Sequence, residues 1–262
     1  MLKSVTHLFY GLALATGLSG APVLAQNEVP VVAAAANLQF AIEEIAEQFT
    51  EDTGSQVRLS IGSTGNIARQ IRQGAPFELF LSADDTTIAG LDDVGLTRDE
   101  GMIYAVGRIV IIAPTGSPLR VDGNLDGLAS ALEAGEISRF AIANPEHAPF
   151  GVAARKALQH KGLWEALQTH LVLGENISQA AQFALSGNAE GGIIAYSLAL
   201  AAEVGGNGTF ELIPEDWHEP LRQRMALLKD AGPAAEAFYD YLQGPPAREI
   251  MERYGFVLPK GE

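Results

Sequence analysis

The stretch VPVVAAAANLQFAIEEIAEQFTEDTGSQVRLSIGSTGNIARQIRQGAPFELFLS, residues 29–82, carries the pattern that decides the fold. It begins with an apolar, strand-like run at 29–35, after which apolar side chains recur at helical spacing from Leu38 to Thr53. Gly54 stands where a helix C-terminal cap is expected. The pattern then predicts strands at 56–61 and 78–82 with a helix at 66–73 between them. A β-α-β-α-β order predicts a parallel sheet with helices on both faces.

The same alternation starts again further along the chain. An apolar strand is predicted at 108–114, and it ends in the breaker cluster Pro-Thr-Gly-Ser-Pro. The elements expected after it are helices at 125–134, 151–160 and 177–185, strands at 140–143, 171–173 and 192–195, then strands at 210–213 and 224–228 and helices at 233–242 and 245–254. Two successive α/β units of this size predict two lobes.

The N-terminus has the pattern of a secretory signal peptide. Lys3 precedes an apolar run from Leu8 to Leu18, and the small residues Val23 and Ala25 stand at −3 and −1 of a cleavage site before Gln26. The apolar run is too short to span a membrane as a helix. We therefore expect residues 1–25 to be removed and the mature chain to work outside the cytoplasm.

Composition excludes several classes of protein. With 17 Lys and Arg against 32 Asp and Glu, the net charge is −15, and no basic run is present for binding nucleic acid. The chain contains no cysteine, and its five histidines never approach the spacing of a zinc motif. We therefore expect no protein-bound metal, no catalytic thiol and no cofactor.

Four strand-to-helix turns share one kind of chemistry. Residues 36–37, 62–66, 144–151 and 174–178 each place small or neutral polar residues where a helix begins. Helix N-termini offer unpaired N–H donors and partial positive charge, which suits an anion. The alternative is that Asn37, Ser63, Thr64 and Asn176 are ordinary helix caps.

A secreted serine hydrolase is the enzyme alternative. The chain offers only Gly62-Ser63-Thr64-Gly65, which lacks the spacing of a nucleophile elbow. His147 lies in a loop bounded by prolines, where we expect an exposed turn residue rather than a catalytic base.

At these turns the chain resembles the periplasmic molybdate-binding proteins of ABC transporters. The resemblance covers essentially the whole chain after the signal peptide, in order. It rests on the stretches VVAAAANL at 31–38, GSTGNIARQI at 62–71, GAPFELFLSAD at 74–84, NPEHAPFG at 144–151, AFYDYL at 237–242 and RYGF at 253–256.

The resemblance implies a type II periplasmic binding fold with two α/β lobes, each a mainly parallel sheet flanked by helices, closing on an oxyanion in the interlobe cleft. Lobe I would comprise residues 26–108 plus 226–262, and lobe II residues 109–225. At 222–226, where the family often has a Tyr-Pro pair, this chain has Arg-Gln-Arg-Met-Ala.

The resemblance also implies a set of ligand-binding residues. Asn37, Ser63 and Thr64 match the side-chain donors of the first lobe, and Phe150 and Ile177 match positions whose backbone N–H groups reach the anion. Some members add a tyrosine hydroxyl. Here Ala195 takes that position and Tyr196, one residue on, is the candidate.

The implied function is capture of molybdate, and also tungstate, in the periplasm and delivery to an ABC-type membrane permease by a monomer without catalytic activity. Within the same class, the alternative ligand is another tetrahedral oxyanion such as sulfate or phosphate. A phosphate site is expected to add an acidic acceptor and an arginine, and among the four turns only Glu146 and Glu175 offer acidic groups.

Overall fold

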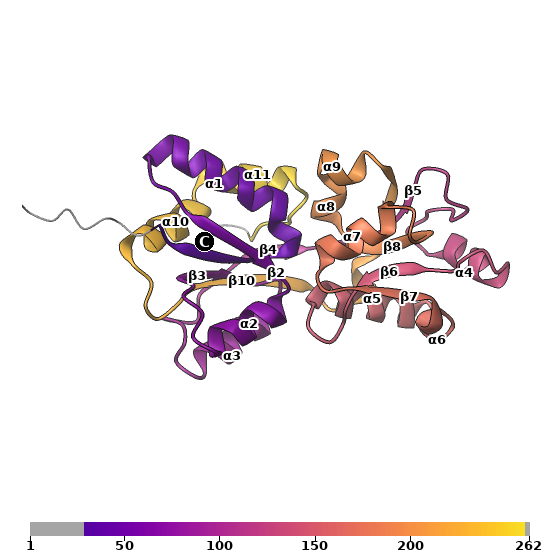
Figure 1. Ribbon diagram of the computed structural model, residues 1–262, viewed down its shortest axis with the longest axis horizontal. Coiled ribbons are helices and arrows are strands. Elements are labelled where there is room, and N and C mark those ends of the chain that lie inside the picture. Colours follow the sequence, from indigo (N-terminus) through magenta and orange to yellow (C-terminus); the bar gives the residue numbers. More distant parts are fainter. Residues whose placement is uncertain (1–28, 260–262) are drawn as a thin grey trace, which may run out of the picture.

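Two five-stranded sheets, each covered by helices, make up residues 29–259, the part of the chain that the computed structural model describes (Figure 1). We call the strands and helices around the first sheet the first lobe, and those around the second sheet the second lobe. The signal peptide predicted at 1–25 lies outside the described residues. Within 29–259, no helix combines the length and the apolar character that a membrane span requires.

The first sheet has the strand order β2-β1-β3-β10-β4. Its strands are β1 (Val31–Ala35), β2 (Arg58–Gly62), β3 (Leu79–Leu81), β4 (Met102–Gly107) and β10 (Leu221–Leu227). Helices α1 (Gln39–Thr53), α10 (Pro233–Gln243) and α11 (Pro245–Arg253) cover one face, while α2 (Thr64–Arg72) and α3 (Asp85–Asp92) cover the other (Figure 1). A 3₁₀ turn, Ala36–Leu38, joins β1 to α1.

The second sheet has the order β7-β6-β8-β5-β9. Its strands are β5 (Ile109–Pro114), β6 (Phe140–Ala143), β7 (Leu171–Gly174), β8 (Gly191–Ala195) and β9 (Gly208–Leu212). The helices are α4 (Asp126–Glu133), α5 (Pro149–His160), α6 (Trp164–Leu167), α7 (Ile177–Leu185), α8 (Tyr196–Leu200) and α9 (Ala202–Gly205). Two further 3₁₀ turns lie at Gln168–His170 and Glu215–Trp217.

The predicted fold class, two α/β lobes, is confirmed, but the sheets are mixed rather than mainly parallel. In the first sheet β1 runs parallel to β2 and β3, whereas β10 runs antiparallel to β3 and β4. In the second sheet β6 runs parallel to β7 and β8, whereas β5 runs antiparallel to β8 and β9. The strands next to the two crossings between lobes make the antiparallel pairs.

The chain passes between the lobes twice. It leaves the first sheet at Gly107 and enters the second at Ile109, and it returns between Leu212 and Leu221. The Nε atom of Arg108 in the first crossing lies 2.8 Å from a carboxylate oxygen of Glu215 in the second. The two crossings are thus tied to each other by an ion pair.

The predicted second boundary between the lobes is corrected by β10. This strand pairs with β4 from Leu221 onward, so residues 221–225 lie in the first sheet and not in the second lobe, where the sequence analysis placed them. Arg222 and Arg224 concealed the start of the strand in the sequence. They alternate with the buried residues Leu221, Gln223 and Met225, as the period of two along a strand requires.

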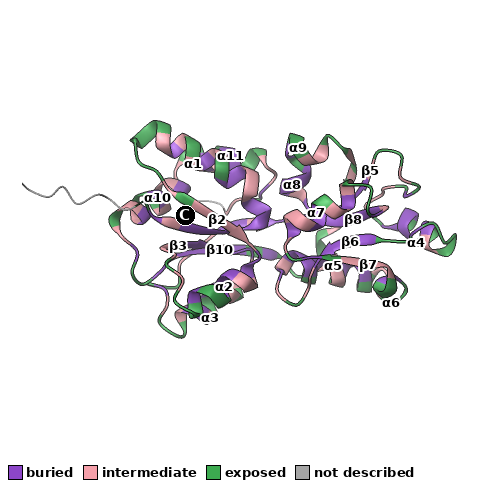
Figure 2. Ribbon diagram, viewed as in Figure 1, coloured by how far each residue is buried: buried purple, intermediate pink, exposed green. Residues whose placement is uncertain are grey.

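Burial follows the layers. The inner strands are mostly buried, the edge strands β2, β7 and β9 are partly exposed, and the outward faces of the helices are exposed (Figure 2). One apolar core fills the second lobe, and two cores lie on the two faces of the first sheet. The core of the second lobe also takes in Ala35, Ala36 and Ala83 of the first lobe, so it continues across the contact between the lobes.

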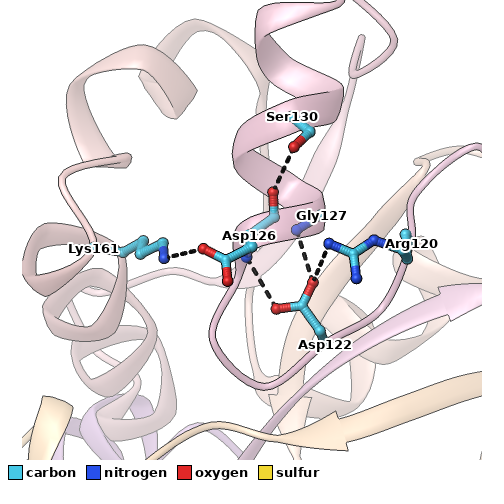
Figure 3. A network of polar contacts seen from close by, with 6 residues as sticks. All are labelled: Arg120, Asp122, Asp126, Gly127, Ser130 and Lys161. Atoms are coloured by element: carbon cyan, nitrogen blue, oxygen red, sulfur yellow. Dashed lines mark hydrogen bonds and ion pairs between the residues drawn. The ribbon is translucent and has the colours of Figure 1, made fainter.

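A carboxylate in the loop before α4, that of Asp122, holds the start of this helix in the second lobe (Figure 3). The Asp122 carboxylate accepts hydrogen bonds from the backbone N–H groups of Asp126 at 3.0 Å and Gly127 at 2.7 Å. Burial alone raises the pKa of Asp122, but these N–H groups and the guanidinium of Arg120 outweigh it and hold the pKa below its usual value. Asp122 therefore stabilises the start of α4 in its ionised form.

Asp122→Ala is expected to lower the free energy of unfolding by about 1–2 kcal/mol at neutral pH, the usual cost of losing a helix cap. Because the folded-state pKa is depressed, the contribution is complete above the unfolded-state pKa of about 4 and is lost as the pH falls through the folded-state value. Urea unfolding at pH 7 and pH 3 measures this. Asp122→Asn, which keeps one acceptor but does not titrate, should lose less stability than Asp122→Ala at pH 7, and its loss relative to the wild type should also shrink at pH 3, because the group that titrates is the wild-type carboxylate. An equal loss for Asp122→Ala at both pH values would contradict the assignment.

Candidate functional site

A small cavity lies between the lobes, at the carboxyl ends of parallel strands from both sheets. In an open α/β sheet this is the edge at which ligands bind. The cavity has only about 10 Å³ for the centre of a water-sized sphere, which is about the space of one water molecule, so in this form it does not admit an organic molecule. It is lined by Ala35, Ala36, Asn37, Gly62, Ser63, Thr64, Ala83, Ala148, Pro149, Phe150, Asn176 and Ile177.

The first lobe contributes side-chain donors to the cavity. Asn37 lies in the 3₁₀ turn after β1, and Ser63 and Thr64 lie where β2 passes into α2. All three are buried, with exposed fractions of 2%, 4% and 1%. The Thr64 hydroxyl oxygen accepts a hydrogen bond from the backbone N–H of Ala83 at 3.0 Å. Since that oxygen acts as an acceptor there, its proton is available for a ligand.

The second lobe contributes helix N-termini. Phe150 is the second residue of α5, which follows β6, and Ile177 is the first residue of α7, which follows β7. Backbone N–H groups in a first helical turn have no acceptor within the helix. Asn176 caps α7 by accepting from the N–H of Gln179 at 3.0 Å, which fixes the end of the helix against the cavity.

Contacts between the lobes close the cavity. The backbone N–H of Gly65 donates to the carbonyl oxygen of His147 at 3.0 Å, and the Nδ1 atom of His147 lies 3.2 Å from the Ser63 hydroxyl. Ser178 and Ser197 donate to the carbonyl oxygens of Ala36 and Asn37 at 3.0 and 2.8 Å. The two lobes are therefore in direct contact around the cavity, which is the arrangement of a closed form.

His147 is a contact between lobes, not the exposed turn residue expected from the sequence. It is half-buried, and its backbone carbonyl and ring both reach the start of α2 in the first lobe. The sequence could not show this because the contact joins segments more than 80 positions apart.

Tyr196 lies outside the cavity, which corrects its predicted place in the site. β8 ends at Ala195 and Tyr196 begins α8, with its ring 6.2 Å from that of Phe210, centroid to centroid. A Cβ atom built on Gly255 would lie 2.6 Å from the ring, so the ring also packs against that glycine. Neither Tyr196 nor Ala195, the last residue of β8, is among the residues that line the cavity.

Two buried residues that support Asn37, Gln223 and Tyr104, were not predicted from the sequence. The Oε1 atom of Gln223 accepts from Nδ2 of Asn37 at 3.0 Å and from the Tyr104 hydroxyl at 2.8 Å, and that hydroxyl also lies 3.0 Å from the Ser82 carbonyl oxygen. Burial, together with the charge of Asp84, raises the pKa of Tyr104 well above its usual value. The alternation of Arg222, Gln223 and Arg224 was the available signal, since it places an amide on the buried side of a strand.

The cavity is built from neutral donors. Among the described residues that line it, none carries a charged side chain. Within 29–259, no three His, Cys, Asp or Glu side chains gather where they could hold a metal ion. Such a site can hold a small anion by N–H and O–H groups alone.

A larger hollow of about 770 Å³ lies elsewhere on the first lobe, with Arg58, Glu78 and Lys229 among its lining residues. It includes Val31, the first residue of β1, and so lies at the amino ends of the parallel strands. Ligand sites of open α/β sheets lie at the opposite edge. The interlobe cavity is therefore the better candidate, although it is smaller.

The fold and the cavity define a two-lobed ligand-binding protein that encloses its ligand between two α/β lobes. The chain belongs to the family of bacterial extracellular solute-binding proteins, whose model matches residues 30–257. It is a solute-binding protein and not an enzyme, as the names of its relatives also indicate.

Individual relatives agree with this assignment. The chain is 40% identical to the molybdate-binding protein ModA of Azotobacter vinelandii over 94% of this chain and 97% of the relative. It is 33% identical to ModA of Escherichia coli over 98% of this chain and 100% of the relative. Among solved structures, the periplasmic molybdate-binding protein of A. vinelandii matches 88% of this chain and 100% of its own with a TM-score of 0.79 and 31% identity.

Proposed function

We propose that this protein captures molybdate, and also tungstate, in the periplasm and delivers it to the permease of an ABC transporter. Relatives at 40% and 33% identity over nearly the whole chain are molybdate-binding proteins. The observation in the structure that carries the proposal is the closed interlobe cavity lined by neutral donors. Molybdate is a compact tetrahedral oxyanion whose oxygens only accept hydrogen bonds.

In this proposal the ligand is held from both lobes. The side chains of Asn37, Ser63 and Thr64 and the backbone N–H groups of Phe150 and Ile177 donate to its oxygens. Donors of this kind disfavour a protonated ligand such as hydrogen phosphate, which would need an acceptor in the site. Sulfate, alike in charge and shape, would then be rejected by cavity size.

The net charge supports a local mode of binding. At −15 the protein repels an oxyanion at long range, so the affinity must come from short-range hydrogen bonds in the interlobe cavity. The same charge is consistent with our proposal that the protein binds no nucleic acid. We also propose that it acts as a monomer and needs no cofactor.

Thermal unfolding in the presence of molybdate, tungstate, sulfate and phosphate tests this function. A ligand at a thousand times its dissociation constant stabilises the folded state by roughly 4 kcal/mol, which raises the melting temperature of a chain of this size by several degrees. We expect such a shift with molybdate and tungstate. No shift with millimolar molybdate would overturn the proposal, and a larger shift with sulfate or phosphate would reassign the ligand.

A further inference from the structure

The buried cluster behind Asn37 leaves two polar atoms unsatisfied. Gln223 is 0% exposed, and one atom of its amide serves both Asn37 and Tyr104. Within residues 29–259, the other amide atom of Gln223, Nε2, and the Oδ1 atom of Asn37 have no hydrogen-bond partner. Buried polar groups are nearly always paired, so two orphans in one cluster require an explanation.

The backbone carbonyl of Ser82 determines the direction of the hydrogen bonds in this cluster. The Ser82 carbonyl oxygen, 3.0 Å from the Tyr104 hydroxyl, can only accept a hydrogen bond. Tyr104 has a single proton to donate, and its raised pKa keeps that proton in place. If the proton goes to Ser82, the Tyr104 oxygen can only accept from Gln223. Gln223 must then present its NH₂ group, not its oxygen, at that position.

The orientation of the Gln223 amide in turn determines the orientation of the Asn37 amide. The NH₂ group of Gln223 has two protons, one for Tyr104 and one for the neighbouring atom of Asn37, which must therefore be Oδ1. Turning the side-chain amides of Gln223 and Asn37 by 180° exchanges their nitrogen and oxygen atoms and preserves the distances of 2.8 and 3.0 Å. Tyr104 then donates to Ser82, and Gln223 donates to both Tyr104 and Asn37. The NH₂ group of Asn37 then occupies the position of the atom that has no hydrogen-bond partner among the described residues. Asn37 is one of the residues that line the cavity.

We propose that Gln223 is a positioning residue that holds Asn37 with its amide N–H group, and not its oxygen, toward the anion site. The inference rests on the proposed function for the identity of the ligand. In the opposite orientation Asn37 would present a carbonyl oxygen to an oxyanion, which is repulsive. Ser82, Tyr104 and Gln223 thus hold the Asn37 side chain so that it offers an N–H donor to the site. None of these residues places a charge there.

The surroundings of Gln223 favour the same orientation. A Cβ atom built on Gly107 would lie 2.5 Å from the second amide atom of Gln223 and 2.9 Å from Cζ of Phe150, so both groups lie against this glycine. The edge of an aromatic ring carries partial positive charge. Since both groups lie against the same glycine, an amide oxygen on the side of the Phe150 ring would be favoured over an N–H group.

The orientation can be measured without any ligand by nuclear Overhauser contacts in the isotope-labelled protein. We expect the side-chain NH₂ protons of Gln223 to contact the Tyr104 ring protons and not the Gly107 Hα protons. Contacts to Gly107 Hα would overturn the inference. Because no ligand is present, this result stands even if molybdate proves not to bind.

A double-mutant cycle tests whether Gln223 acts through Asn37. Gln223→Met and Asn37→Ala are each expected to weaken molybdate binding about tenfold or more, measured by titration calorimetry. If Gln223 acts through Asn37, the double variant binds no more weakly than Asn37→Ala alone. Additive losses would show a merely structural role and overturn the inference.

Two further variants complete the design. Gln70→Met makes the same change at an exposed position of α2 and should leave the affinity unchanged. Tyr104→Phe removes the hydroxyl that orients Gln223, and it replaces Gln223→Met in the cycle if that variant does not fold. Its loss of affinity should likewise vanish in the Asn37→Ala background, and a loss that persists there counts against the inference.

Discussion

Gly65→Ala is expected to weaken molybdate binding by about 100-fold, or roughly 2.7 kcal/mol. A Cβ atom at this position would lie 2.8 Å from the carbonyl oxygen of His147, 3.0 Å from its Cβ and 3.1 Å from its Cα. These atoms belong to the opposite lobe and two of them are backbone, so the lobes cannot close to their present distance. In the variant, the hydrogen bond of 3.0 Å from the residue 65 N–H to His147 would be strained for the same reason.

The unliganded Gly65→Ala protein should be at least as stable as the wild type, because alanine favours helix by up to about 1 kcal/mol over glycine. Calorimetric titration together with thermal unfolding of the unliganded protein separates the two effects. Gly90→Ala in α3 is the matched control, since a Cβ there would meet only the Arg72 side chain, at 3.5 Å. Wild-type affinity in Gly65→Ala would show that the lobes need not approach this closely around the ligand.

Thr64→Val is expected to weaken molybdate binding by about 10- to 100-fold, since a hydrogen bond to a charged ligand contributes roughly 1.5–3 kcal/mol. Valine keeps the shape of the buried side chain but has no hydroxyl proton to donate. It also leaves the Ala83 N–H without its acceptor, which costs the unliganded protein about 1–3 kcal/mol of unfolding free energy.

Thr64→Ser separates the hydroxyl from the methyl group. Serine keeps both the acceptor for Ala83 and the donor for the ligand, so its affinity should stay within a few-fold of the wild type. Titration calorimetry gives the affinities, and urea unfolding gives the stability of the unliganded proteins. If Thr64→Val binds molybdate as tightly as Thr64→Ser, the hydroxyl does not contact the ligand.

Much of the fold follows from local patterns in the sequence. The helix at 177–185 and the strand at 140–143 have the predicted bounds, because apolar periodicity and flanking turn residues both mark their ends. The turns after β1, β2, β6 and β7 come together at one cavity because the carboxyl ends of neighbouring parallel strands share an edge. Asn37, Ser63, Thr64, Phe150 and Ile177, which the four turns and the family resemblance suggested, all line this cavity, and their role in binding a ligand stays a prediction.

The features that could not be predicted from the sequence depend on pairing between segments that are distant along the chain. β4 was missed because Met102–Gly107 runs almost directly into β5, and only the change of sheet separates the two strands. Gln223 meets Asn37, and Tyr104 meets Gln223, through strands that are remote along the chain. Tyr196 begins α8 beyond the end of β8 and is not among the residues that line the cavity.

The position of β10 has a consequence for the order in which the protein can fold. This strand lies between β3 and β4, yet it is the last strand of the chain. A chain that emerges from its N-terminus can complete the whole second sheet while the first remains in two unconnected pieces. The first lobe is therefore assembled last, by long-range contacts that close slowly. Until residues 221–227 arrive, Asn37 lacks the buried Gln223 side chain that holds it.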